Sequence, residues 1–317
     1  MMPAPWMGQV PPAAFASIAA LLHARSGLVL GPDKLYLLDT RLRPILKREG
    51  LHGLADLALR LRAPGAEDLA REVVEAMTTN ESFFFRDEKP FTHLRDVALP
   101  RLAAARAPGS VLRLWSAAAS CGQEAYSLAM LLAEHPFAGA LRAEILGTDI
   151  AREPLARARA GIYTSFEVQR GLPAAMLRRH FVRHGAGWRV GDALRAAVRF
   201  QEWNLLSDLR PLGRFDVVFL RNVLIYFDVP TRARVLDKVA RQMAPDGVLY
   251  LGGAETALGV TELLVPVPGG HGAYAPKPAA QATADPMRFR TGTGSEALHM
   301  ASNRERPGAC GGSSSGS

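Results

Sequence analysis

The stretch VLRLWSAAASCGQEAYS, residues 111–127, most constrains what this chain can fold into. It begins with a short apolar run, Val111–Trp115, of the kind that forms a buried strand. Residues 116–122 are almost all small and lead into a helical segment. Such a loop lets a ligand approach the backbone, and the helix after it presents free N–H groups. The pattern predicts a ligand site in an open α/β sheet, although a tight turn that binds nothing has the same composition.

Size and charge narrow the class of protein. The chain has 317 residues and a formal charge of +8, which suits an acidic partner, although an arginine-rich genome produces the same excess. Its cysteines, Cys121 and Cys310, are too few for a disulfide framework or a metal site. No apolar run could span a bilayer, and the N-terminus lacks the basic segment of a signal peptide. We therefore expect a cytoplasmic protein with no metal and no membrane insertion.

Residues 1–76 are predicted to form an all-helical domain. Apolar residues recur there at helical spacing in four segments, and Gly27, Gly50 and Gly65 lie between them. The second helix has a leucine-rich side for the core. Its opposite side is basic and carries Lys34, Arg41, Arg43, Lys47 and Arg48. A charged helix face is commonly only solvated, and here it is also a candidate for docking on an acidic surface.

Residues 77–90, MTTNESFFFRDEKP, are predicted to form a linker. Thr, Asn and Ser are typical of caps and loops, and three consecutive phenylalanines fit neither helical nor strand alternation. These rings would anchor the segment in an apolar site and hold Arg86 rigidly. The alternatives are a buried interdomain hinge and a segment that presents Asn80, Ser82 and Arg86 to a ligand.

Residues 91–277 are predicted to form an α/β domain. Apolar strand segments alternate with helical ones, which indicates a mostly parallel sheet with helices on both faces. The alternation lapses in an accessory subdomain at about 162–197, where a glycine-rich hairpin precedes Trp188. Residues 278–317 are rich in Ala, Gly, Ser and Thr, and their composition predicts a disordered tail.

Polar residues follow the strands of this predicted sheet. Glu124, Asp149, Asn204 and Asn222 each lie at or just after a strand's carboxyl end, where they should converge. An acid at the end of the second strand suits two ribose hydroxyls. The first loop has no G-x-G-x-x-G, so no pyrophosphate cradle is evident. The carboxylates instead suit a ligand with a sulfonium and an amino group, which favours S-adenosylmethionine over NAD.

The segments TTNESFFFRD, WSAAASCGQEAYSLAM, LGTDIAREPLARARAGIY, NLL and FDVVFLRNVLIYF together resemble the CheR family of chemotaxis receptor methyltransferases, in one order within residues 14–276. The resemblance implies a Rossmann-like S-adenosylmethionine-dependent methyltransferase domain with an all-α N-terminal domain and a small β-subdomain. It also implies methyl transfer to glutamate side chains of a chemoreceptor's cytoplasmic helical bundle, with S-adenosylhomocysteine as product.

The resemblance implies a set of site residues. The cofactor contacts would be Asn80, Ser82, Arg86, Glu124, Asp149, Asn204, Leu205, Asn222 and Val223. Tyr226 would lie near the transferring methyl group, and Tyr226 or Arg86 would orient the substrate carboxylate, with Tyr226 preferred because Arg86 would blunt the nucleophile. Cys121 and Gln123 depart from the family's usual Thr and Glu, which puts the contacts of the first loop in question.

Two other functions remain open at this point. One is methyl transfer to RNA or a small molecule, although aromatic residues are not interleaved with the basic ones as stacking binders require, and we expect no nucleic acid. The other is a cofactor-binding scaffold without turnover. The hairpin at His184–Trp188 is shorter than in family members that dock a receptor's C-terminal peptide, so we expect no such tether.

Overall fold

The computed structural model describes residues 10–107, 109–135 and 142–278. Cys310 and nearly all of the predicted tail, 278–317, lie outside the described residues.

The N-terminal helices pack around a core of their own. The helices are α1 (Pro12–Ser26), α2 (Leu35–Arg48), α3 (Leu54–Arg60) and α4 (Glu67–Met77). The predicted apolar side of α2 is buried at Leu38, Leu42, Ile45 and Leu46, because these residues recur at helical spacing and meet α3 and α4. Gly27 ends α1 in the left-handed conformation, where a residue without Cβ is unstrained.

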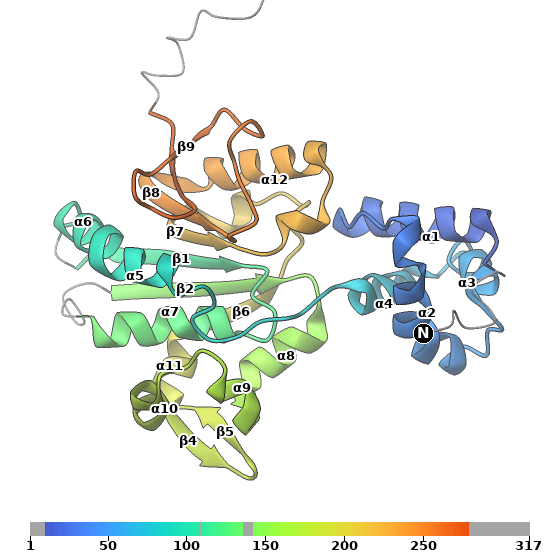
Figure 1. Cartoon of the computed structure of the whole chain (residues 1–317), viewed down its shortest axis with the longest axis horizontal. Coiled ribbons are helices and arrows are strands. Elements are labelled where there is room, and N and C mark those ends of the chain that lie inside the picture. The colour runs from blue at the N-terminus through green and yellow to red at the C-terminus, as the bar shows by residue number, and fades with distance from the viewer. Residues whose placement is uncertain (1–9, 108, 136–141, 279–317) are drawn as a thin grey trace, which may run out of the picture. The chain divides into compact units, whose positions relative to one another are not determined.

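A seven-stranded sheet forms the centre of the α/β domain, in the order β6-β2-β1-β7-β8-β10-β9 (Figure 1). The strands are β1 (Val111–Ala117), β2 (Arg142–Asp149), β6 (Val198–Glu202), β7 (Phe215–Leu220), β8 (Met243–Leu251), β9 (Leu264–Pro266) and β10 (Ala273–Pro276). The first five strands in this order pair in parallel, and β10 pairs antiparallel to both of its neighbours. The sheet confirms the predicted α/β fold.

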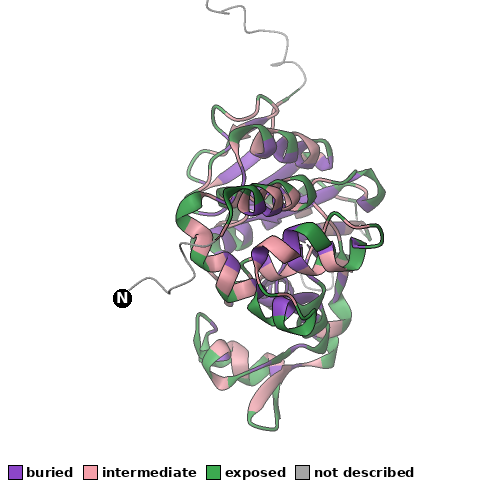
Figure 2. Ribbon diagram, turned by 90° about the vertical axis from the view of Figure 1, so that its right-hand side faces the viewer, coloured by how far each residue is buried: buried purple, intermediate pink, exposed green. Residues whose placement is uncertain are grey.

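Helices cover both faces of this sheet. One face packs against α5 (Lys89–His93), α6 (Leu99–Ala104), α7 (Gln123–Glu134), α8 (Arg152–Ala160) and α11 (Asp192–Ala197). The other face packs against α12 (Val229–Arg241). Strand β1 shows why both faces are covered: Leu112 and Leu114 enter one core, and Trp115 and Ala117 the other. Buried residues follow the strands and the inner sides of the helices (Figure 2).

The helix expected around Phe91–Leu102 is interrupted, as its proline suggested. A π-helical turn, Leu94–Ala98, separates α5 from α6. Pro100 has no N–H for the carbonyl group four residues earlier, so a regular helix cannot continue through this point. The segment still buries Leu94 and Leu99 against the sheet.

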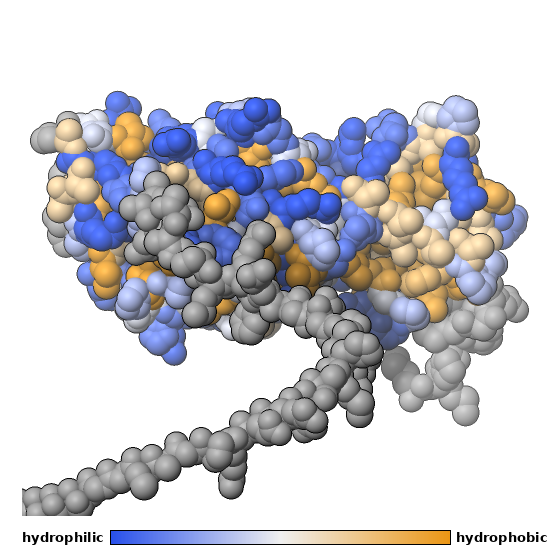
Figure 3. All heavy atoms as spheres, turned by 90° about the horizontal axis from the view of Figure 1, so that it is seen from above, coloured by the Kyte–Doolittle hydropathy of each residue, from blue (hydrophilic) through white to orange (hydrophobic). Residues whose placement is uncertain are grey.

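The accessory subdomain contains a three-stranded sheet in the order β3-β5-β4. Its elements are β3 (Ile162–Tyr163), α9 (Ser165–Gln169), α10 (Ala174–His180), β4 (Phe181–His184) and β5 (Gly187–Val190). Strands β4 and β5 form the predicted hairpin, with Gly185 in a left-handed conformation between them. Seen from above, hydrophilic side chains cover much of the α/β domain, and more apolar residues gather toward the N-terminal helices (Figure 3).

Candidate active site

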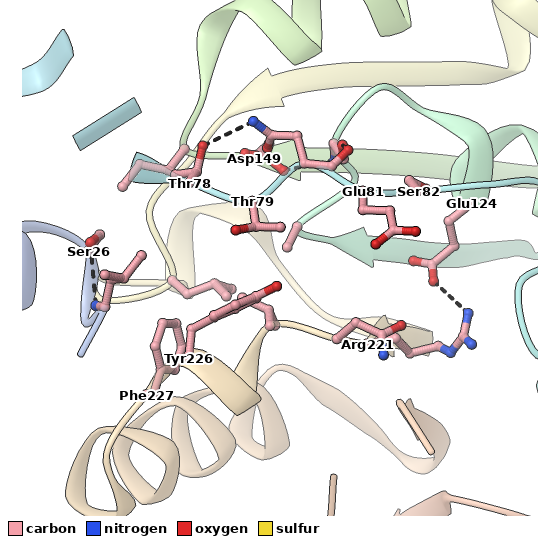
Figure 4. Close-up of a pocket in the computed structure, with 18 of the residues that line it drawn as sticks. Ser26, Thr78, Thr79, Glu81, Ser82, Glu124, Asp149, Arg221, Tyr226 and Phe227 are labelled. Atoms are coloured by element: carbon pink, nitrogen blue, oxygen red, sulfur yellow. Dashed lines mark hydrogen bonds and ion pairs between the residues drawn. The ribbon is translucent and has the colours of Figure 1, made fainter. Parts of the chain in front are cut away.

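One cavity lies at the carboxyl ends of the parallel strands, beneath the linker. Its empty volume is about 970 Å³, part of it open to solvent, which is within the range of small-molecule sites. All of the residues expected to contact cofactor or to act on substrate line it: Asn80, Ser82, Arg86, Glu124, Asp149, Asn204, Leu205, Asn222, Val223 and Tyr226. The cavity therefore collects side chains from the linker and from the ends of β1, β2, β6 and β7 (Figure 4).

Asp149 is the last residue of β2 and is 7% exposed. The backbone N–H of Ser120 donates to its Oδ2 (2.8 Å), and that of Ala151 to its Oδ1 (2.9 Å). Burial raises the pKa of this carboxyl group, and these N–H groups partly offset the effect. Because each carboxylate oxygen has a further lone pair, Asp149 can still accept bonds from two hydroxyl groups of a ligand.

Glu124 lies in the first turn of α7. The Ser116 hydroxyl donates to its Oε1 (2.8 Å), and Arg221 donates to its Oε2 (3.0 Å). Burial raises the pKa of Glu124, and the charge of Arg221 and the Ser116 hydrogen bond oppose the rise. The result is a fixed carboxylate that faces the cavity and suits a cationic group.

Left-handed backbone shapes two of the loops around the cavity. Ala118 has a φ of 65°, Ser120 of 50° and Asn222 of 58°, all in a region that costs energy for residues other than glycine. The turn at Asn222 is held by Glu255, which accepts from the N–H of Asn222 (2.8 Å) and that of Gly252 (2.7 Å). Glu255 follows β8, the strand that pairs with β7. The sequence did not indicate its role, because only the pairing of these two strands brings Glu255 to Asn222.

The phenylalanines anchor the linker, as the sequence suggested. Phe84 is fully buried, and its ring meets Tyr163 and Phe181 of the accessory subdomain edge-on, with centroids 5.1 and 5.6 Å away. The ring of Phe83 contacts the guanidinium groups of Arg86 and Arg170, which lie 5.3 and 4.3 Å from its centroid. These ring contacts fix the linker across the carboxyl ends of the parallel strands.

Arg86 and Tyr226 approach the cavity from different elements. Arg86 donates to the carbonyl oxygen of Glu81 (3.1 Å). Tyr226 ends a 3₁₀ turn, Leu224–Tyr226, and its hydroxyl points into the cavity (Figure 4). The carbonyl oxygen of Tyr226 accepts from the N–H of Val29 (2.9 Å), so the segment after α1 supports this turn.

Asn204 connects the cavity wall to the N-terminal domain. Its amide nitrogen donates to the carbonyl oxygen of Arg25 (2.6 Å), and its Oδ1 accepts from the N–H of Leu206 (2.9 Å). Ser26, the last residue of α1, and Leu28, which follows the helix, also line the cavity. Sequence patterns did not indicate this contribution, because the two residues carry no motif and reach the site only through the packing of α1.

Arg221 is a further site residue that the sequence analysis missed. It follows β7 directly, its side chain is 1% exposed, and it pairs with both Glu124 and Asp87. The signal available was an arginine between the apolar run Val217–Leu220 and Asn222. A charge in that place needs buried partners.

Two departures from the family pattern lie outside the cavity lining. Cys121 and Gln123 are both buried, and neither lines the cavity. Burial raises the pKa of the Cys121 thiol. The Gln123 Oε1 atom has no hydrogen-bond partner within the described part of the chain. These substitutions therefore change the packing beneath the first loop rather than the surface facing a ligand.

The basic face of α2 has several internal partners. Arg41 donates to the carbonyl oxygens of Met77 (2.7 Å) and Thr78 (2.9 Å), so it holds the start of the linker. Arg43 pairs with Asp39 on the same helix, and Arg48 pairs with Glu49 and Glu72. Lys34 and Lys47 complete the set of candidates. The positive potential of this face of α2 is therefore weaker than the count of its basic residues suggests.

The described residues contain no group of three or more His, Cys, Asp or Glu side chains that could hold a metal ion. Within the same part of the chain, no helix is both long enough and apolar enough to cross a membrane.

A mostly parallel sheet whose carboxyl edge brings the acid ending β2 and the acid in the first turn of α7 to one cavity is the arrangement of an S-adenosylmethionine-dependent methyltransferase. The carboxylates of Asp149 and Glu124 fit that cofactor, because their oxygens keep lone pairs that can accept from hydroxyl and ammonium groups. The CheR all-alpha domain matches residues 13–78, and the CheR methyltransferase SAM-binding domain matches residues 80–271. The chain belongs to the CheR methyltransferase family.

Several curated relatives match most of the chain. The chemotaxis protein methyltransferase Cher2 of Pseudomonas putida is 38% identical over 253 residues, 78% of this chain and 92% of the relative. Chemotaxis protein methyltransferase 1 of Pseudomonas aeruginosa is 40% identical over 76% of this chain and 89% of its own length. Chemotaxis protein methyltransferase 1 of Vibrio cholerae is 39% identical over 78% and 90%.

Proposed function

We propose that this enzyme transfers the methyl group of S-adenosylmethionine to glutamate side chains of chemoreceptors and leaves methyl esters. The observation that carries the proposal is that carboxylates suited to a cationic cofactor line one cavity together with Tyr226 and Arg86. Membership in a family whose relatives are chemotaxis protein methyltransferases supports the choice of substrate.

When bound, the cofactor supplies an electrophilic methyl group on a positively charged sulfur and leaves as S-adenosylhomocysteine. In this proposal Asp149 accepts from the ribose hydroxyls, and Glu124 accepts from the amino group. Asn204, Leu205, Asn222 and Val223 contact the rest of the cofactor from the ends of β6 and β7. Asn80, Ser82 and Arg86 close over it from the linker.

The substrate end needs little acid–base chemistry. A glutamate carboxylate is already ionised near neutral pH, so it can act as the nucleophile without a general base. Tyr226 would hold it by one neutral hydrogen bond, which positions the oxygen without withdrawing much of its charge. Arg86 would pair more strongly and lower the nucleophilicity, so we assign orientation to Tyr226. Positioning of this kind can supply about 7–11 kcal/mol of the barrier.

The partner would be the cytoplasmic helical bundle of a receptor, which places the enzyme in the cytoplasm. Its acidic segments would meet the basic side of α2, with Lys34 and Lys47 the more available charges and Arg41, Arg43 and Arg48 already paired internally. The β4–β5 hairpin is short, with two residues between its strands, so we propose recognition without a C-terminal peptide tether.

Methyl-labelled cofactor and receptor cytoplasmic fragments provide the test. We expect label on the receptor that mild alkali releases as methanol, because esters hydrolyse under conditions that leave methylamines intact. Asp149→Ala should abolish the transfer. Label that resists alkali, or no transfer to any receptor fragment by enzyme that binds S-adenosylhomocysteine, would contradict the proposal.

A further inference from the structure

Arg221 contacts two parts of the site that are far apart in sequence. Its Nη1 donates to Glu124 Oε2 (3.0 Å) on α7. Its Nη2 donates to Asp87 Oδ2 (2.7 Å) and to the carbonyl oxygen of Arg86 (2.7 Å) in the linker. One planar guanidinium therefore spans the gap between the α7 carboxylate and the segment that closes over the cavity (Figure 4).

The linker needs such a contact because its backbone is strained where Arg221 holds it. Phe85, Asp87 and Glu88 have φ values of 48°, 64° and 41°. Non-glycine residues stay in this region only when their surroundings fix them. The Phe85 N–H donates to the Ser127 hydroxyl (3.0 Å), and Arg221 supplies the contacts on the other side of Arg86. Loss of Arg221 would free this turn to relax.

We propose that Arg221 is a positioning residue that couples cofactor binding by Glu124 to the placement of the linker. The proposal rests on the proposed roles of Glu124 and the linker in holding S-adenosylmethionine. Through Arg221, the carboxylate and the turn that carries Arg86 keep one relative position, so a ligand meets both at once. Arg221 itself is outside the reaction, since both of its Nη atoms already donate to Glu124, Asp87 and the carbonyl oxygen of Arg86.

A second arginine of the same kind offers a matched control. Arg106 also pairs with two acids, Asp216 and Asp246, and is 19% exposed. Asp216 is near the start of β7, whereas Arg221 follows its end. Arg106 does not line the cavity. Replacement of Arg106 should lower the stability of the protein and leave its affinity for the cofactor unchanged.

The affinity for S-adenosylhomocysteine, measured by calorimetry on the full chain, tests the coupling. We expect Arg221→Gln to raise the Kd by about tenfold or more, and Arg106→Gln to leave it within twofold although both variants melt earlier. Arg221→Lys should recover the Kd only in part, because an ammonium group lacks the planar fork that reaches both acids. An unchanged Kd in folded Arg221→Gln, or full recovery by lysine, would overturn the proposal.

Asp87→Asn provides an independent test that does not threaten folding, because the Asp87 side chain is 47% exposed. It should raise the Kd by about threefold in the wild-type chain and have no further effect with Arg221→Gln. If the double variant instead raised the Kd by the product of the two single-variant increases, the two residues would act separately, and the coupling would be overturned. Glu124→Ala with an unchanged Kd would instead refute the assigned role of Glu124, which separates failure of the site assignment from failure of this inference.

Discussion

The hydroxyl of Ser120 donates a 2.9 Å hydrogen bond to the carbonyl oxygen of Asn80. This bond joins the loop after β1 to the linker, while the N–H of Ser120 donates to Asp149. Ser120 thus places the expected ribose-binding acid and the linker relative to each other. Ser120 itself lines the cavity, so a larger side chain at this position would reduce the space for a ligand.

Tyr226→Phe should separate binding from turnover. Removal of one hydrogen bond of about 0.5–1.5 kcal/mol from the substrate carboxylate predicts a loss of about three- to tenfold in kcat. The Kd for S-adenosylhomocysteine should stay unchanged, because the cofactor contacts remain. The control is Tyr274→Phe, which removes a hydroxyl that meets Thr256 (3.1 Å) outside the cavity. Near-normal turnover in Tyr226→Phe would remove this tyrosine from the mechanism.

Cofactor affinity should fall as the pH is lowered. The fall should begin at a higher pH than it would for a glutamate with an ordinary pKa. Burial raises the pKa of Glu124, while Arg221 and Ser116 oppose the rise and Glu255 adds to it. Protonation removes the charge that would accept from the cofactor's ammonium group, so affinity is lost as the pH falls through the raised value. Calorimetry from pH 8 to pH 5 should show a weaker but flatter profile for Glu124→Gln. Parallel profiles for the two proteins would rule out Glu124 as a source of the dependence.

Phe84→Ala should destabilise the protein and loosen the linker. The ring is fully buried between Tyr163 and Phe181, and removal of such a ring costs about 3–5 kcal/mol. Chemical denaturation should report the loss, and the Kd for S-adenosylhomocysteine should rise because the anchor of Ser82 and Arg86 is gone. Phe83→Ala removes a less buried ring and should cost much less. Equal losses for both variants would show that burial of Phe84 is not the anchor.

The cap of α12 should weaken at low pH. Asp228 accepts from the N–H of Thr231 (2.8 Å) and lies 2.9 Å from Nε2 of His23 on α1. Bonds from Thr231, and then His23, lower the pKa of Asp228 to about 2. A lowered pKa gives stability that is present above pH 4 and lost as the pH falls toward 2. The difference in Tm between wild type and Asp228→Ala should therefore shrink over that range; a constant difference would contradict the assignment.

The local pattern of apolar and polar residues was sufficient to predict much of the fold. The strand Phe215–Leu220 follows from a short apolar run that is buried on both faces of the sheet, and the helix ending at Met77 follows from apolar residues at helical spacing. Strands β9 and β10 were not predicted, since they are short and pair antiparallel at the sheet edge. Strand β8 begins at Met243, earlier than Val248, because Phe215 pairs with Met243 across an irregular register.

Asp149 and Asn222 could be placed from the sequence because parallel strands end at a common edge, so their position along a strand determines where they lie. The partners of charged side chains could not be placed from the sequence in this way. Arg221 meets residues 97 and 134 positions away, and Arg41 turns from the expected docking face to the linker. Periodicity indicates which side chains are buried, but the packing of distant elements decides which charges meet, and only the tertiary structure shows it.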